Sequence, residues 1–323
     1  MISRVAEHCY WMARYLERAE NTARILEVNQ TLLLDLQVPI EEQWKPLLII
    51  SGLHEYDDEP TSENVQDFMT WDTENPFSIV TSLWWARENA RIIREVVSAE
   101  VWERMNYYHL WLQKAESREL FHGNRGEFYA QIRRINQLLS GIANATMSHD
   151  EPWQFVRLGR SLERLNQTAR ILDVKYHTLL PRVDDVGSPV DNAHWMAILM
   201  SCSAYEPFHK TGWAMTETAN AVVEFLMFDD HFPRSIHHCA SSCSRSLKAI
   251  ASYSPTDPHR ITEADTVAAE LLNWLDSRSG KQVIADGLHE SLTHIVDSTH
   301  DLGSAVTQTY FALGSTPPGL VAA

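Results

Sequence analysis

Apolar side chains recur every three or four positions along most of the chain, which is the spacing of one face of an α-helix. Ile92, Ile93 and Val96 follow this spacing, and Leu271 and Leu275 follow it near the other end. No stretch alternates apolar and polar residues as a half-buried strand would. The pattern therefore predicts an all-α protein.

Prolines mark where the expected helices begin and end, because a proline inside a helix removes a backbone hydrogen bond and clashes with the preceding turn. Dipeptides such as Asn75-Pro76 and Phe232-Pro233 interrupt the helical pattern in this way. We expect helices at residues 2–36, 40–56, 62–70, 77–98, 100–120, 124–148, 151–180, 190–206, 212–228, 233–252, 260–279 and 282–312.

One helical segment is written twice. Residues 14–26 read RYLERAENTARIL and residues 160–172 read RSLERLNQTARIL, and nine of these thirteen positions are identical at an offset of 146. A second pair of similar segments, 68–72 and 225–229, is followed in each case by a proline and then by Ser-Ile, at an offset of 157. Two related halves of the chain explain both pairs.

The two halves cover about residues 1–146 and 147–313. Helices from each half would pack as a single large helical bundle about a pseudo-twofold axis, so we expect one domain over residues 1–313. Residues 314–323, which include two consecutive prolines, are expected to form a flexible tail.

The repeated segment has an apolar side and a polar side on a helical wheel. The polar side of the first copy carries Arg14, Glu17, Arg18 and Arg24, and the second copy keeps the same residue types at the matching positions. A solvated face needs only charge, so the retention of arginine and glutamate indicates a geometry that uses the planar guanidinium. Pairs along one helix, such as Arg14 with Glu17, would also stabilise an exposed helix, and a solvated face stays an alternative.

The second copy lacks one acid of the first, because residues 165–167 read Leu-Asn-Gln where residues 19–21 read Ala-Glu-Asn. If the two copies face each other, the polar centre between them is net positive. Such a centre suits an anionic substrate group or an acidic segment of a partner.

Candidate site residues follow from this centre and from a weaker third occurrence of the motif at residues 86–93. Glu17 and Glu163 are the candidates for acid–base catalysis, since arginine-flanked carboxylates in a cavity can have separated pKa values. The candidates for binding are Arg14, Arg18, Asn21, Arg24, Arg87, Arg91, Arg160, Arg164 and Arg170.

The formal net charge is -16, so the surface would repel a nucleic-acid backbone and we expect no nucleic-acid partner. Arginine supplies 21 of the 27 basic residues, which favours fixed contacts with carboxylates or phosphates. The longest apolar stretches fall short of the ~20 residues that span a bilayer, so we expect no membrane partner. Four cysteines without a disulfide spacing, and an N-terminus without a signal sequence, predict a reducing, cytoplasmic location.

The histidines and cysteines do not have the spacing of an ordinary metal site. His289 and His294 are five residues apart, which places them on different sides of a helix, and the Glu-x-x-His spacing at residues 206–209 contains a proline. Cys239 and Cys243 share a helix face and could bind a soft metal, but buried core thiols are the commoner arrangement. Because glycine-rich nucleotide loops are also absent, we expect no metal and no cofactor, and any ATP site would belong to a partner.

Aromatic residues are concentrated between residues 84 and 111. Packing in the core is their expected role, although an exposed part of the group would form a protein-docking surface. The residues are Trp84, Trp85, Trp102, Tyr107, Tyr108 and Trp111.

Several of these motifs together resemble the alpha-E family, helical bacterial proteins named for a Glu-Arg motif. The resemblance is carried by residues 4–26, which contain Tyr-Trp-Met-Ala-Arg-Tyr-Leu-Glu-Arg, and by residues 86–91, 153–164 and 232–235. It therefore extends over nearly the whole chain.

Alpha-E proteins are encoded beside, or fused to, circularly permuted ATP-grasp amide ligases, often near transglutaminase-like proteins. The resemblance thus implies an accessory or partner role in ATP-driven peptide synthesis or peptide modification. The implied partners are an ATP-grasp ligase, a transglutaminase-like protein and a peptide substrate. Two alternatives stay open, namely an enzyme that acts on a peptide or amino acid in an Arg/Glu-lined pocket, and a structural scaffold with Glu-Arg ion pairs only.

Overall fold

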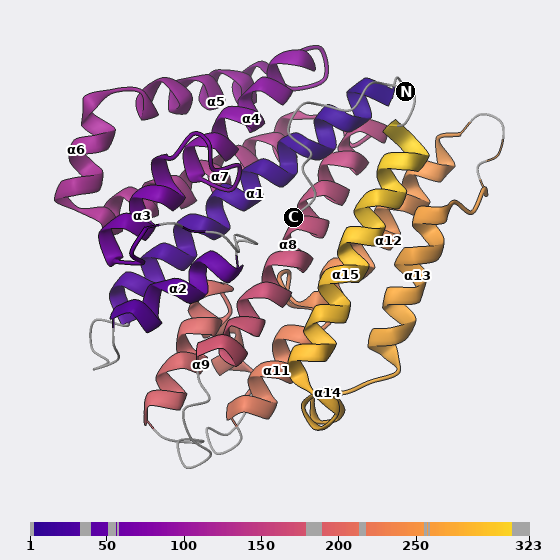
Figure 1. Cartoon of the computed structure of the whole chain (residues 1–323). Helices are drawn as coiled ribbons and strands as arrows, with labels where there is room; N and C mark the ends of the chain where they lie inside the picture. The colour runs from indigo at the N-terminus through magenta and orange to yellow at the C-terminus, as the bar shows by residue number, and fades with distance from the viewer. Residues whose placement is uncertain are drawn as a thin grey trace.

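A computed structural model of the chain describes residues 3–32, 40–50, 56, 58–178, 189–212, 218–254, 257 and 259–311. The structure is 82% helical, with fifteen α-helices and no strand in these residues (Figure 1). The all-α prediction is confirmed. Among the described helices, none is both long enough and apolar enough to cross a membrane.

The helices before residue 147 form the first part of the chain. They are α1 (Ser3–Leu32), α2 (Ile40–Ile50), α3 (Ser62–Trp71), α4 (Ile79–Ile92), α5 (Ala99–Leu112), α6 (Ala115–Gly123) and α7 (Arg125–Thr146).

The second part contains the remaining helices. They are α8 (Glu151–Thr178), α9 (Pro189–Ser201), α10 (Tyr205–Lys210), α11 (Thr218–Phe228), α12 (Ile236–Ser252), α13 (Glu263–Asp276), α14 (Gly280–Asp286) and α15 (Leu288–Val306), followed by a π-helical turn, η4 (Thr307–Phe311).

The two helices that carry the repeated segment, α1 and α8, lie against each other in the middle of the molecule (Figure 1). On one side, α4 and α7 pack along α1, and α5 covers α4 and α7. On the other side, α12 and α15 pack along α8, and α13 covers α12 and α15. The pseudo-twofold relation between the halves and the single domain over residues 1–313 stay predictions.

The backbones of α1 and α8 come very close at Gly159. A Cβ atom placed on this glycine would lie 2.3 Å from the carbonyl oxygen of Tyr10. The absence of a side chain therefore permits the contact between the two central helices.

Three of the predicted helices are interrupted. The helix predicted at 282–312 breaks at Gly287, whose φ of 114° is outside the helical region, and the one at 190–206 breaks near Ser203, with a φ of 54°. The helix predicted at 100–120 ends at Leu112, because the Ser117 hydroxyl donates to the carbonyls of Leu112 and Lys114, which closes a turn before α6. Glycine and serine thus interrupt these helices at positions without a proline.

The predicted helices at 62–70, 124–148, 151–180, 233–252 and 260–279 agree with the structure to within three residues, and the one at 77–98 ends at Ile92. Those at 2–36, 40–56 and 212–228 each agree at the one end that the structure describes. Some predicted positions lie outside the described residues. They are residues 2, 33–36, 51–55, 179–180, 213–217 and 312, and the predicted tail at 314–323.

Candidate functional site

Glu163 of α8 lies between two arginines of α1. Arg14 Nε donates to its Oε2 at 2.8 Å, while Arg18 donates from Nε to Oε1 at 2.7 Å and from Nη2 to Oε2 at 3.2 Å. Both guanidinium groups lie over aromatic rings. The guanidinium carbon of Arg14 is 4.8 Å from the ring centroid of Trp11, and that of Arg18 is 5.0 Å from the ring centroid of Phe77. The carboxylate of Glu163 is therefore fully paired in a buried position.

Glu17 of α1 is bound from the opposite direction by α8. Arg164 Nε donates to its Oε1 at 2.8 Å, and Nη1 of Arg234, in the loop before α12, lies 2.8 Å from the same oxygen. Glu17 is 1% exposed. Each copy of the repeated segment thus supplies the positive charge that neutralises the glutamate of the other copy.

Glu20 connects this pairing to two further elements. Arg24 donates from Nη2 to its Oε1 at 2.5 Å, Arg234 donates from Nη2 to the same oxygen at 2.9 Å, and Asn136 of α7 donates to Oε2. Arg234 also donates to Oδ1 of Asn21 at 2.8 Å. The network, here named the Glu-Arg centre, consists of Arg14, Glu17, Arg18, Glu20, Asn21, Arg24, Asn136, Arg160, Glu163, Arg164 and Arg234.

The arginines determine the charge state of the two central glutamates. Burial alone would raise the pKa of Glu163, but Arg18 and Arg14 outweigh burial and hold this pKa at about 2. Burial likewise opposes ionisation of Glu17, and Arg164 and Arg234 hold its pKa at about 2. Both groups are ionised at neutral pH, so this pair does not have the separated pKa values on which the acid–base hypothesis rests.

Positive charge exceeds negative charge in the centre. Six arginines face three glutamates, which leaves an excess of three positive charges. Arg160 is the clearest expression of this excess, because within the described residues its guanidinium donates no hydrogen bond and forms no ion pair. Burial, together with repulsion from Arg164, lowers the pKa of Arg160 to about 10. The fold thus retains a positive charge that its surroundings disfavour.

Three buried polar atoms of the centre have no hydrogen-bond partner in the described part of the chain. They are Glu17 Oε2, Asn21 Nδ2 and Arg24 Nε. Buried atoms of this kind are ordinarily satisfied by water or by a polar ligand. The centre therefore has hydrogen-bonding capacity beyond its internal pairs.

Two of the candidate arginines have their contacts elsewhere, and a third lies beside the centre. Arg87 donates to Asn106 of α5 at 3.0 Å, and Arg91, with a side chain 56% exposed, pairs with Glu88 at 2.8 Å. The structure therefore places these two arginines on the α4–α5 side and does not bring them to the Glu-Arg centre. Arg170, one turn farther along α8, donates to Asn166 at 2.9 Å, and its charge also interacts with those of Glu163 and Arg18.

The list of candidates lacked three residues that complete the centre, Glu20, Arg234 and Asn136. Arg234 stands in the family-like segment 232–235, and this position in the motif is the signal that could have identified it. Asn136 carries no such signal, because only the packing of α7 against α1 brings it to Glu20.

The two halves carry different residues between the proline and the serine that follow the second pair of similar segments. Phe77 and Arg234 each follow a proline and precede a serine that caps a helix, Ser78 for α4 and Ser235 for α12. Phe77 lies against the guanidinium of Arg18, whereas Arg234 binds Glu17 directly. Positive charge is therefore concentrated on the Glu17 side of the centre.

The residues considered for metal binding are engaged in other contacts. Nδ1 of His289 lies 2.7 Å from Oδ1 of Asp173, and Nε2 of His237 lies 2.9 Å from Oδ1 of Asp276. Cys239 and Cys243 are buried in the core. Within the described residues, no group of three or more His, Cys, Asp or Glu side chains is arranged to hold a metal ion.

Comparison with known proteins gives a family and a set of distant relatives. The family alpha-E, described as a predicted alpha-helical domain with a conserved ER motif, matches residues 1–311. Uncharacterized proteins of Mycobacterium bovis and Mycobacterium tuberculosis are 25% identical over 338 residues, which covers 96% of this chain and 37% of each relative. The chain thus spans about a third of the length of these relatives. No solved structure matches it.

Proposed function

Because this chain belongs to the alpha-E family, we propose that it is an accessory protein of an ATP-grasp amide ligase in peptide synthesis or modification. In this proposal the Glu-Arg centre holds an acidic segment of the ligase or of its peptide substrate. The family resemblance is the basis for proposing the ligase partner and the peptide chemistry. The role of the centre comes from its geometry.

The observation that carries the proposal is the excess of three positive charges in the centre. Uncompensated charge in a partly dry environment is costly, and an incoming carboxylate would remove that cost. Arginine forks favour carboxylate or phosphate groups because they can donate two parallel hydrogen bonds. An acidic peptide segment has the complementary charge and geometry.

Arg160 is the residue we assign to direct contact with the acidic segment. The other arginines of the centre are already held by glutamates, as Arg18 is by Glu163 and Arg164 by Glu17. Arg160 donates to no group among the described residues and is partly accessible. Because its pKa is lowered in the folded chain, the positive charge of Arg160 decreases the stability of the fold. Charged residues that destabilise a fold in this way are typical of functional sites.

The length of the mycobacterial relatives supports a physical partnership. This helical unit makes up 37% of each relative, so in those proteins it is covalently joined to a larger remaining part. A unit that is linked to other sequence in its relatives is expected to contact that sequence. We propose that the ligase occupies the corresponding place beside this chain.

A single substitution tests the role of the centre. Arg160→Gln is expected to weaken binding of the ATP-grasp ligase of the source organism about tenfold, because one charge-assisted contact is lost. Titration calorimetry measures the affinity, and product formation below saturation falls in parallel. The melting temperature should stay the same or rise, since the removed charge is one that the fold disfavours.

Arg157→Gln is the matched control. Arg157 lies one turn earlier on α8 and donates to Gln154 at 3.4 Å, so its replacement should leave affinity and turnover unchanged. Full affinity in a folded Arg160→Gln variant would contradict the assignment of the centre. No binding of the ligase to the unaltered chain would contradict the partnership itself.

The reciprocal pairing of Glu17 and Glu163 favours one alternative, a structural scaffold in which the centre only clamps α1 to α8. Under this alternative, replacing an arginine of the clamp lowers stability and leaves ligase binding intact. The Arg160→Gln variant separates the two functions, because Arg160 takes no part in the clamp among the described residues.

A further inference from the structure

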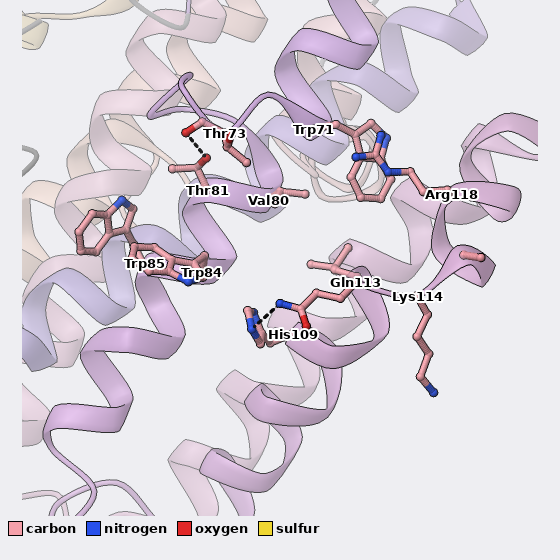
Figure 2. Close-up of a pocket in the computed structure, with 12 residues that line it drawn as sticks. Trp71, Thr73, Val80, Thr81, Trp84, Trp85, His109, Gln113, Lys114 and Arg118 are labelled. Atoms are coloured by element: carbon pink, nitrogen blue, oxygen red, sulfur yellow. Dashed lines mark hydrogen bonds between the residues drawn. The ribbon is translucent and has the colours of Figure 1, made fainter.

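A cleft of about 690 Å³ lies between α4 and α5, away from the contacts of the Glu-Arg centre (Figure 2). This volume is in the range of small-molecule sites. In Figure 2, Trp84 and Trp85 lie on one side, Trp71 and Arg118 lie on the other, and His109 and Gln113 line the edge of α5.

Indole rings provide the apolar walls of the cleft. Trp84 is 41% exposed, an unusual state for so large an apolar side chain, and its ring centroid lies 4.5 Å from that of Trp85. Leu112 and Val80 extend the same surface. A planar apolar body that stacked on Trp84 would remove this area from water.

Positive charge stands beside these walls without a compensating acid. The guanidinium carbon of Arg118 lies 3.8 Å from the ring centroid of Trp71, and no carboxylate among the described residues pairs with it. Lys114 is a second basic residue of the lining, and none of the twelve lining residues is Asp or Glu. In a chain with a net charge of -16, such a lining favours an anionic ligand.

A buried donor adds to this preference. Nε1 of Trp71 has no hydrogen-bond partner in the described part of the chain, although Trp71 is 7% exposed. An indole N–H can only donate, so the missing partner is an acceptor. Because this atom is closed to solvent and Arg118 lies over the face of the ring, a carboxylate at Arg118 would reach the N–H only with a shift of the indole.

We propose that this cleft binds an aromatic carboxylate, with the ring of the ligand against Trp84 and its carboxylate at Arg118 and Trp71. A free aromatic acid and a peptide that ends in an aromatic residue share this chemistry. A cationic aromatic ligand does not fit, because Arg118 occupies the face of Trp71 and repels a second cation. The site is independent of the proposed ligase partnership.

Calorimetric titration with four related probes tests the proposal. N-acetyl-tryptophan is expected to bind with a Kd on the order of 0.1 mM, the value that ordinary ligand efficiency gives for about 18 non-hydrogen atoms. N-acetyl-tryptophanamide, which lacks the charge, should bind about tenfold more weakly, and tryptamine should not bind. The tripeptide Ala-Ala-Trp with a free carboxylate distinguishes a peptide terminus from a free acid.

Variants of the lining locate the site. Arg118→Gln and Trp84→Ala should each weaken N-acetyl-tryptophan about tenfold, and Trp71→Phe, which removes only the N–H donor and part of the ring, should weaken it about threefold. Arg118 and Trp84 are both exposed, so their replacement leaves the core intact. Arg104→Gln, an exposed position on α5 outside the cleft, is the control and should bind as the unaltered chain does.

Equal binding of N-acetyl-tryptophan and its amide would overturn the assignment of a carboxylate at Arg118. No binding of either acid at millimolar concentration, or unchanged affinity in both the Arg118 and the Trp84 variants, would overturn the site. Tighter binding of the tripeptide than of N-acetyl-tryptophan would identify a peptide end as the natural source of the group.

Discussion

At the scale of single residues, Glu17 and Glu163 illustrate how burial and charge compete. Each is 1% exposed, and a carboxylate so placed would be neutral without its arginines. Two guanidinium groups beside each glutamate keep its carboxylate ionised. The arginines of one helix are therefore a condition for burying the glutamate of the other.

This competition predicts an acid-sensitive fold. The ordinary pKa of both carboxyls is 4.5, and in the folded chain both are about 2. Because the folded values lie below the unfolded ones, the stability contributed is complete above about pH 5 and is lost as the pH falls from there to about 2. We expect the free energy of unfolding to drop on the order of 3 kcal/mol per carboxyl across that window, as measured by urea titrations at several pH values.

Glu163→Gln is the control for this pH dependence. Loss of the charge leaves Arg14 and Arg18 unpaired, so the variant should be about 3 kcal/mol less stable at neutral pH. Its stability should also fall less steeply between pH 5 and pH 2, since one of the two titrating groups is gone. An unaltered slope in this variant would contradict the pKa assigned to Glu163.

At the scale of elements, the position of α8 against α1 depends on close backbone contact as well as on ion pairs. Gly159 of α8 approaches Tyr10 of α1, and ion pairs follow along the same interface from Arg14 to Arg164. The spacing of the two helices at this glycine therefore helps to determine whether the guanidinium groups reach their carboxylates.

Gly159→Ala tests this dependence. Alanine ordinarily stabilises a helix by about 1 kcal/mol relative to glycine, but here its Cβ would lie 2.3 Å from the Tyr10 carbonyl oxygen. We expect the free energy of unfolding to decrease by about 2–3 kcal/mol because the helices must separate. Gly141→Ala in α7 is the matched substitution, since nothing lies within 4 Å of its Cβ, and it should raise stability by about 0.5–1 kcal/mol. Chemical denaturation of both variants measures the difference, and similar effects in the two would contradict the close contact.

Sequence periodicity predicted the helical class and most helix positions because apolar spacing reports which face is buried. It did not predict the breaks at Ser117 and Ser203, where the decisive interactions are a hydroxyl bonded to carbonyls and a single left-handed residue. The register of the repeat pointed to Glu17 and Glu163 as facing groups. Asn136 could not be found in this way, since it joins the centre through tertiary packing alone.

At the scale of the whole molecule, the four cysteines report on the integrity of one core. All four are buried, and they come from α1, from the residue that follows α9 and from α12. Burial raises the pKa of Cys9, Cys202 and Cys239 to about 12 and also raises that of Cys243. Their thiols are therefore neither accessible nor ionised in the folded chain.

The thiols should accordingly be inert until the molecule opens. We expect no reaction with a disulfide reagent such as Ellman's reagent in native buffer, and reaction of all four thiols in guanidinium chloride. Absorbance of the released thiolate gives the count. Rapid native reaction of any one thiol would show that its part of the core opens locally.

The reciprocal pairing of α1 and α8 also has a consequence for synthesis on the ribosome. Glu17 is bound by Arg164, which lies 147 residues later in the chain. At a translation rate of about 5–20 residues per second, Arg164 is synthesised about 7 to 30 s after Glu17. During translation the nascent first half therefore carries an exposed charged helix face that cannot yet be buried, and its central packing is completed only once the second copy of the motif has left the exit tunnel.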